Sequence, residues 1–132
     1  MQRRTTTTLM LGVAQTLAWA SSYYLPAVVA APMGRDVGMS SSAVFGAFSM
    51  ALLVAAATGP WAGCAIDRVG GRPVLIVSNL VFAAGLAALS LASQPAHVFA
   101  AWALMGLAMG SGLYEAAFAT VVRLHSQDAR RA

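Results

Sequence analysis

Hydrophobic residues gather in four long stretches of this sequence, and almost no charged residue lies inside them. A helix that crosses a membrane needs about 20 mostly apolar residues. Stretches of that kind occur at about 9–33, 43–66, 74–92 and 96–122. Within them, polar and apolar residues do not alternate as they would in the strands of a membrane barrel. The pattern predicts an all-α, polytopic membrane protein with four transmembrane helices.

Short polar connections separate the four stretches, at 34–42, 67–73 and 93–95. Connections of this length make each helix antiparallel to the one before it. One of the serines at 40–42 can cap the second helix, because a serine hydroxyl accepts a hydrogen bond from a free N–H of the first turn. Pro95 suits the first turn of the fourth helix, where its missing N–H costs nothing.

Composition supports a membrane protein: 59% of the residues are hydrophobic and 9% are charged, whereas soluble domains carry about 25% charged residues. The formal net charge is +4, but the arginines flank the apolar stretches and form no patch for nucleic acid. The single cysteine, Cys64, excludes an internal disulfide and has no metal-ligand spacing to a histidine. No arrangement typical of a catalytic site is present, so we expect neither an enzyme nor a cofactor or metal site. The absence of lysine and the abundance of alanine favour a bacterial origin.

The arginines lie mostly on one side of the predicted helices. Seven of them precede the first stretch, lie in the second connection or follow the fourth stretch: Arg3, Arg4, Arg68, Arg72, Arg123, Arg130 and Arg131. The first and third connections hold only Arg35. Because the cytoplasmic loops of membrane proteins carry the excess of basic residues, we expect both termini and the second connection in the cytoplasm, with the chain in the inner membrane.

The start of the chain has a second interpretation. Arg3, Arg4, the apolar residues after them and the Ala-x-Ala pattern at 18–20 are also typical of a signal peptide and its cleavage site. The apolar residues continue to Met33, well beyond that point. This length favours a transmembrane helix.

The second connection contains the pattern G-x-x-x-D-R-x-G-x-R, formed by Gly63, Asp67, Arg68, Gly70 and Arg72. It resembles the signature loop between helices two and three of the major facilitator superfamily of secondary transporters. That loop usually has a further basic residue, which a glycine replaces here. The resemblance implies a conformational latch, in which the aspartate engages neighbouring helix ends and the arginines engage acidic or headgroup partners.

The resemblance covers the whole chain and implies a transporter that moves a small molecule across the lipid bilayer by alternating access. Members of the family normally have about twelve helices in two halves, each built of inverted three-helix repeats. We therefore expect residues 1–132 to be the first four helices of such a protein, part of its N-terminal half, and to be inactive without the remainder. Two alternatives stay open: a small four-helix transporter that works as a homodimer, and a membrane subunit that does not transport.

Two groups of residues are candidates for a substrate or ion cavity. Gln15, Trp19 and Ser22 recur at spacings of four and three residues, so they share one helix face, with Tyr23 beside them. Glu115 is the only acidic residue deep inside a predicted helix, where an ionised group usually faces a cavity or a partner. The alternatives are helix packing, an interfacial position for Tyr23, and a protonated Glu115 that hydrogen-bonds a neighbouring helix.

Glycines four residues apart allow membrane helices to approach closely. Gly59 begins one such pair, Gly106 and Gly110 form another, and Gly112 follows them, so we expect these residues at helix contacts. Trp102 stands where the family often carries an arginine linked to proton coupling. This leaves the acidic residue of the fourth helix as the local candidate for coupling.

Overall fold

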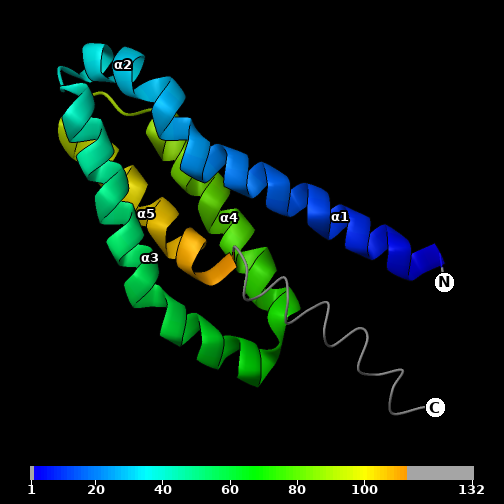
Figure 1. Cartoon of the computed structure of the whole chain (residues 1–132). Coiled ribbons are helices and arrows are strands. Elements are labelled where there is room, and N and C mark those ends of the chain that lie inside the picture. Colours follow the sequence, from blue (N-terminus) through cyan, green and yellow to red (C-terminus); the bar gives the residue numbers. More distant parts are fainter. Residues whose placement is uncertain (1, 113–132) are drawn as a thin grey trace.

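The computed structural model describes residues 2–112, and every regular element in that range is a helix (Figure 1). The elements are α1 (Gln2–Trp19), the π-helical turn η1 (Ala20–Tyr24), α2 (Leu25–Val37), α3 (Ser41–Val69), α4 (Gly71–Ser90) and α5 (Pro95–Gly112). Because α1, η1 and α2 follow one another without interruption, the described chain forms four antiparallel helical segments. The predicted all-α architecture is confirmed.

The first helical segment contains a π-turn directly before a proline. Pro26 has no N–H to donate, and in a regular α-helix its ring would press on the carbonyl one turn earlier. The wider turn of η1 lies at this point, and the buried Ser22 hydroxyl donates to the Ala18 carbonyl oxygen at 2.7 Å. A π-turn of this kind is frequent at functional sites. The helix also continues through 18–20, where a signal peptide would end.

The first connection is shorter than the sequence predicted, because α2 continues to Val37 and only residues 38–40 are non-helical. Gly38 ends α2 in the left-handed conformation, with φ 69°, which glycine adopts without strain. The Gly34 carbonyl then accepts the N–H of Met39 at 2.7 Å. Ser40 caps α3, since its Oγ accepts the Ala43 N–H at 3.2 Å, as expected for one of the three serines.

The second connection differs most from the prediction. The sequence predicted a loop at 67–73, but in the structure Gly70 is the single residue between α3 and α4. Gly70 has φ 91° and ψ 163°, a conformation that residues with a side chain rarely adopt, and its N–H donates to the Ile66 carbonyl at 2.8 Å. Arg68 fits the last turn of α3 because a cation is favourable at a helix C-terminus. Pro73 fits the first turn of α4, where its missing N–H costs nothing.

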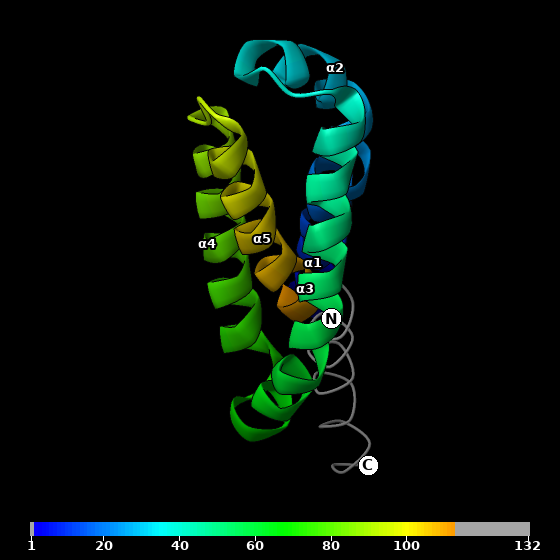
Figure 2. The same cartoon turned by 90° about the vertical axis from the view of Figure 1, so that its left-hand side faces the viewer.

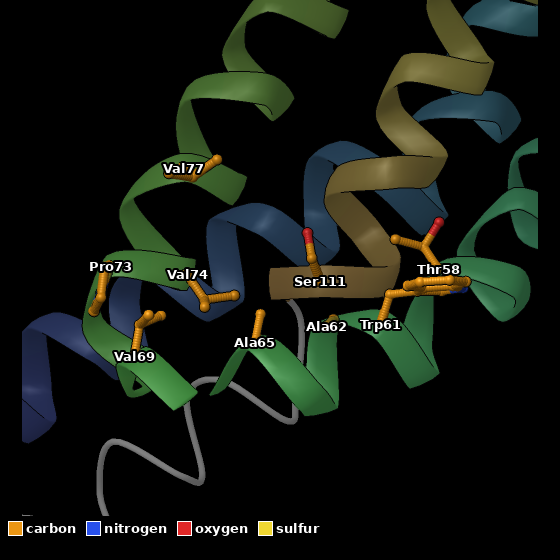
Figure 3. Close-up of a pocket in the computed structure, with 9 residues that line it drawn as sticks. All are labelled: Thr58, Trp61, Ala62, Ala65, Val69, Pro73, Val74, Val77 and Ser111. Carbon is orange, nitrogen blue, oxygen red and sulfur yellow. The ribbon is translucent and has the colours of Figure 1, made fainter. Parts of the chain in front are cut away.

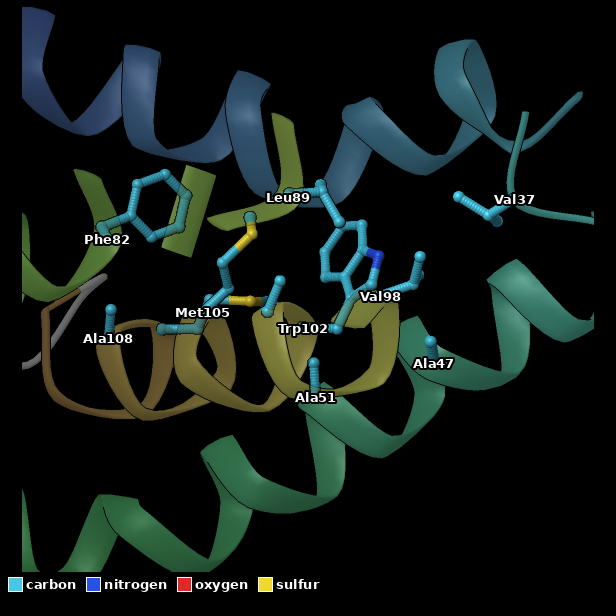
Figure 4. Packing of buried hydrophobic residues seen from close by; sticks show 11 residues of the cluster. Val37, Ala47, Ala51, Phe82, Leu89, Val98, Trp102, Met105 and Ala108 are labelled. Atoms are coloured by element: carbon cyan, nitrogen blue, oxygen red, sulfur yellow. The ribbon is translucent and has the colours of Figure 1, made fainter. Parts of the chain in front are cut away.

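Helix α5 lies between α3 and α4 and forms the centre of the core (Figures 1 and 2). It begins at Pro95, as predicted. Ala47 and Ala51 face it from α3, while Trp102 and Met105 of α5 are fully buried (Figure 4). Phe82 and Leu89 of α4 close the same cluster of buried residues.

Among the described residues, α3 and α4 are long and apolar enough to cross a membrane. Their outward side chains are apolar as well, with Leu53 72% and Leu80 67% exposed. A surface of this kind suits a surrounding of lipid tails. The fourth predicted stretch is described only as far as Gly112, so its remainder to 122 lies outside the described residues.

Candidate functional site

Four aromatic side chains form a continuous row across three helical segments. Trp19 and Tyr23 stack with their ring centroids 4.3 Å apart and an angle of 17° between the planes. Tyr23 meets the edge of Phe48 on α3 at 5.9 Å, and Phe48 meets Trp102 on α5 at 5.2 Å, both nearly perpendicular. We call these four residues the aromatic row. It connects the first helix with the buried centre of the molecule.

Gln15 lies one helical turn before the aromatic row and links α1 to the end of α5. Its Nε2 donates to the Gly112 carbonyl oxygen at 3.0 Å. Because that carbonyl can only accept, the bond fixes the orientation of the amide and points Oε1 away from it. The Oε1 atom is enclosed and has no hydrogen-bond partner among the described residues. The Gln15 amide therefore has one oxygen that is both buried and unbonded among the described residues.

A groove of about 420 Å³ runs along α1 and η1 beside these groups. Its lining consists of Gln15, Thr16, Trp19, Ala20 and Tyr24. The Thr16 hydroxyl is already bonded to the carbonyl of Gly12 in its own helix, at 2.9 Å. The groove therefore offers aromatic surface and the exposed hydroxyl of Tyr24.

The structure brings together three of the four predicted cavity residues of the first helix. Gln15 and Trp19 line the groove, and Tyr23, which is 38% exposed, stacks on Trp19. Ser22 lies on the same helix but is fully buried, and its hydroxyl bonds backbone carbonyls of the preceding turn. It holds the π-turn and does not line the groove. Glu115, the fifth predicted residue, lies outside the described residues.

A second groove of about 370 Å³ lies where α3 meets α4, close to the end of α5 (Figure 3). Its lining is apolar apart from two hydroxyl groups and the indole N–H of Trp61: Thr58, Trp61, Ala62, Ala65, Val69, Pro73, Val74, Val77 and Ser111. Thr58 donates to Val54 O at 2.7 Å, and Ser111 donates to Leu107 O at 2.8 Å. Since both hydroxyls satisfy their own helices, this groove has little to orient a polar ligand.

The residues of the loop motif lie at the junction of α3 and α4. Gly63 is partly buried within α3, and Gly70 is the buried break between the helices. The charged side chains of Asp67, Arg68 and Arg72 are all exposed, and no ion pair between them occurs in the described part of the chain. They are thus accessible to groups outside the described helices.

The glycines predicted at helix contacts differ in how closely another helix approaches them. A Cβ on Gly106 would collide with the carbonyl oxygen of Ala51, and one on Gly110 with that of Ala55, so α5 and α3 touch along their backbones. A Cβ on Gly112 would collide even more severely, with the side chain of Ser78 on α4. Gly59, in contrast, has open space at its Cβ position, so no close helix contact exists there within the described residues.

A hydrogen bond strengthens the contact between α4 and α5. The buried Ser78 hydroxyl donates to the carbonyl of Ala108 at 2.8 Å, whereas the exposed Asn79 only bonds Leu75 of its own helix. In the part of the chain that the structure describes, no group of three or more His, Cys, Asp or Glu side chains could hold a metal ion.

Sequence reasoning did not find two members of the aromatic row, Phe48 and Trp102. The sequence analysis named Trp102 only because the family often has an arginine near this position. It lies in the first third of the stretch 96–122, so its position alone did not distinguish it from a tryptophan of the membrane interface. Phe48 carried no signal either, because phenylalanine is an ordinary residue in any apolar helix.

Comparison with known proteins agrees with the loop motif. The model of the Major Facilitator Superfamily matches residues 11–132, which include the groove, the aromatic row and the junction of α3 and α4. No curated protein and no solved structure matched the chain significantly. Since the family model covers most of the sequence, this chain belongs to the major facilitator superfamily and is a membrane transporter.

Proposed function

We propose that this chain forms the first part of a secondary transporter that moves a small molecule across the bacterial inner membrane by alternating access. The wall of its substrate pathway consists of Gln15, the aromatic row and the groove along α1 and η1. The observation that carries the proposal is the enclosed Gln15 amide, bonded to Gly112 O on one side and unpartnered among the described residues on the other.

The energetic cost of this amide supports a functional role. An enclosed acceptor without a partner costs about 1–3 kcal/mol. In a state of the transporter that exposes Oε1, a water molecule or a substrate group removes that cost when it donates to this oxygen. In a membrane helix such polar groups typically face a pathway or a partner, because lipid tails cannot satisfy them.

The exposed motif charges support the idea of a larger protein around these helices. Asp67, Arg68 and Arg72 lie at adjoining helix ends and form no ion pair with one another. We propose that they act as a latch, engaging helix ends or lipid headgroups beyond the described residues. The arginine distribution supports a cytoplasmic position for this junction and for both termini.

Glu115 completes the proposal as the residue that handles a proton or cation. It follows Gly112, the acceptor of the Gln15 bond, by three positions in the sequence. Glu115→Gln keeps the size and the hydrogen bonding of the side chain but cannot ionise. Coupled transport by the full-length protein is expected to be lost in this variant, while the protein still accumulates in the membrane.

The test of alternating access needs no knowledge of the substrate. In a Cys64→Ser background, a single cysteine replaces Ala20 in the groove and is treated with a membrane-impermeant maleimide from either side. We expect labelling from both sides in the full-length protein, and an Asp67→Asn change should shift the ratio of the two rates. A cysteine at Leu80, on the outward face of α4, is the control and should react from neither side.

Labelling of the cysteine at 20 from one side only, in both backgrounds, would contradict alternating access. The same labelling method tests the orientation. A cysteine at Ser93 should react from outside intact cells, and one at Ser126 should be protected from the reagent there.

A further inference from the structure

The second groove, between α3 and α4, combines an apolar lining with a positive charge at one end. We infer that it holds one acyl chain of an anionic phospholipid, whose phosphate binds Arg68. This inference deepens the proposed function, because it rests on the cytoplasmic position proposed for the α3–α4 junction and gives a motif arginine a lipid partner.

The lining of the groove suits a hydrocarbon chain. Trp61, Val69 and Val77 are exposed side chains that line it, and both of its hydroxyl groups are bonded within their own helices. The small Ala62 and Ala65 leave room between the ring of Trp61 and the valines of α4 (Figure 3). A chain of methylene groups gains dispersion contacts along such a surface and needs no hydrogen bond.

The groove has the depth of about one lipid leaflet. Helix α3 has 29 residues, which makes it about 43 Å long, whereas the hydrocarbon layer of a membrane is about 30 Å thick. Its last turn, which contains Arg68, therefore extends into the headgroup region. The lining follows α3 from Val69 back to Thr58, a rise of about 16 Å, or roughly half of the hydrocarbon layer. An acyl chain in the groove would run from the headgroups to about the middle of the bilayer.

The helical repeat puts the positive charge of α3 beside the groove and the negative charge away from it. Arg68 follows Trp61 by seven residues and Ala65 by three, so it lies on their side of the helix. Asp67 is two residues from Ala65 and from Val69, a rotation of about 200°, so it lies on the opposite side. A phosphate at this end of the groove therefore meets the guanidinium of Arg68 without facing the Asp67 carboxylate.

Arginine and the proposed orientation both favour an anionic lipid. A guanidinium binds phosphate through two parallel hydrogen bonds, and Arg68 is exposed and available for them. The cytoplasmic leaflet is rich in anionic lipids, and basic pockets between membrane helices on that side bind their headgroups. Trp61, exposed about two turns before Arg68, is also a residue type that gathers near the headgroups.

The experiment uses the Trp61 ring as its reporter. The full-length protein is reconstituted in phosphatidylcholine nanodiscs, to which phosphatidylglycerol or phosphatidylcholine with brominated chains is added. Bromine quenches the fluorescence of an indole that it touches, and the difference between the unchanged protein and Trp61→Phe isolates the signal of Trp61. We expect phosphatidylglycerol to bind beside Trp61 about fivefold more tightly than phosphatidylcholine, the effect of one arginine near a charged lipid surface.

Two results of this comparison overturn the inference. Equal quenching by the two lipids shows that the site has no preference for an anionic headgroup. Quenching by neither lipid shows that another part of the full-length protein, such as a further helix, covers the groove.

Variants then test the two halves of the site. Arg68→Gln should abolish the preference for phosphatidylglycerol, whereas Arg35→Gln, the same charge change at the opposite end of the bundle, should keep it (Figure 1). Ala65→Leu fills the groove and should weaken phosphatidylglycerol binding, while Ala56→Leu, on the opposite side of α3, is its control.

An unchanged preference in Arg68→Gln, or an equal loss in Arg35→Gln, overturns the assignment to Arg68. Equal affinities in Ala65→Leu and Ala56→Leu overturn the assignment to the groove. If Arg68→Gln fails to accumulate, the comparison of the two lipids on the unchanged protein still decides the headgroup preference.

The results also separate this inference from the proposed function. Two-sided labelling of the cysteine at 20 with equal quenching by the two lipids refutes the lipid site and leaves the transporter proposal intact. A preference for phosphatidylglycerol with one-sided labelling supports the lipid site and refutes alternating access.

Discussion

Helices α5 and α1 are held in the molecule by different means. Helix α5 lies between α3 and α4, and its glycines bring its backbone against the carbonyl groups of α3. Helix α1 is held by the bond of Gln15 to Gly112 O, by Leu11 near the α3–α4 junction and by the aromatic row. The side chains on its outer face are exposed, as Leu9 (65%) and Leu17 (63%) show.

This contrast separates a fixed part of the protein from an adaptable one. Small residues along α5 allow its backbone to lie directly against that of α3. Among the described residues, helix α1 depends on a few side-chain contacts, which is typical of regions that open at low free-energy cost. The candidate groove lies on α1. Placing ligand groups on the more adaptable helix allows binding to change the position of that helix relative to the bundle.

The largest loss of stability is expected for a substitution of Trp102, which belongs both to the core around α5 and to the aromatic row. Trp102→Ala removes a fully buried ring and leaves a cavity beside Phe48 of α3. We expect a loss of roughly 3–5 kcal/mol in the free energy of unfolding. Trp61→Ala is the matched control, because Trp61 is 79% exposed. Thermal unfolding of the purified full-length variants should separate the two, and equal melting temperatures would refute a core role for Trp102.

The two glycine pairs provide the next test, because alanine should lower stability at Gly106 and raise it at Gly59. In Gly106→Ala the new methyl group meets Ala51 O, so we expect a loss of roughly 1–3 kcal/mol. In Gly59→Ala the methyl group enters open space, and the better helix propensity of alanine should stabilise the helix by up to about 1 kcal/mol. Melting temperatures that change in the same direction would show that the contact between α3 and α5 is not specific.

A smaller effect is expected for the hydrogen bond between α4 and α5. Ser78→Ala removes the bond to Ala108 O and should cost about 0.6 kcal/mol, the average for hydrogen bonds between membrane helices. Ser49→Ala is the control, because the exposed Ser49 bonds only Phe45 in its own helix, at 3.0 Å. A difference below the error of the measurement between these two variants would mean that the interhelical bond adds nothing to stability.

The smallest effect on stability is expected for Asp67→Asn, at the exposed junction. The side chain is solvent-exposed and has no described ion-pair partner, so the melting temperature should stay within the range of ordinary surface changes, about ±0.5 kcal/mol. Transport by the full-length protein should nevertheless fall strongly, because the change removes the charge of the proposed latch. Normal uptake at normal protein level would exclude this role.

The sequence by itself determined the properties that depend on local chemistry. Charge-free apolar stretches of about 20 residues predict helices because only a helix satisfies its own backbone in lipid. The serines at 40–42 and Pro95 marked helix starts correctly because capping and the missing proline N–H act within one turn, but which of the three serines is the cap came from the structure. The helical repeat also placed Gln15, Trp19 and Ser22 on one face. The loop motif at Gly63–Arg72 identified the family that the family model then matched.

The tertiary structure alone decided which of these faces meet and how they are used. Gly59 and Gly106 each begin the same four-residue glycine pattern, yet only Gly106 presses against a neighbouring backbone. Ser22 shares a face with Gln15 but points into the backbone of the π-turn. Phe48 and Trp102 join the aromatic row from helices far apart in the sequence. The reason is physical: the helical repeat fixes which residues share a face, whereas the partner of that face depends on the fit of side chains between helices.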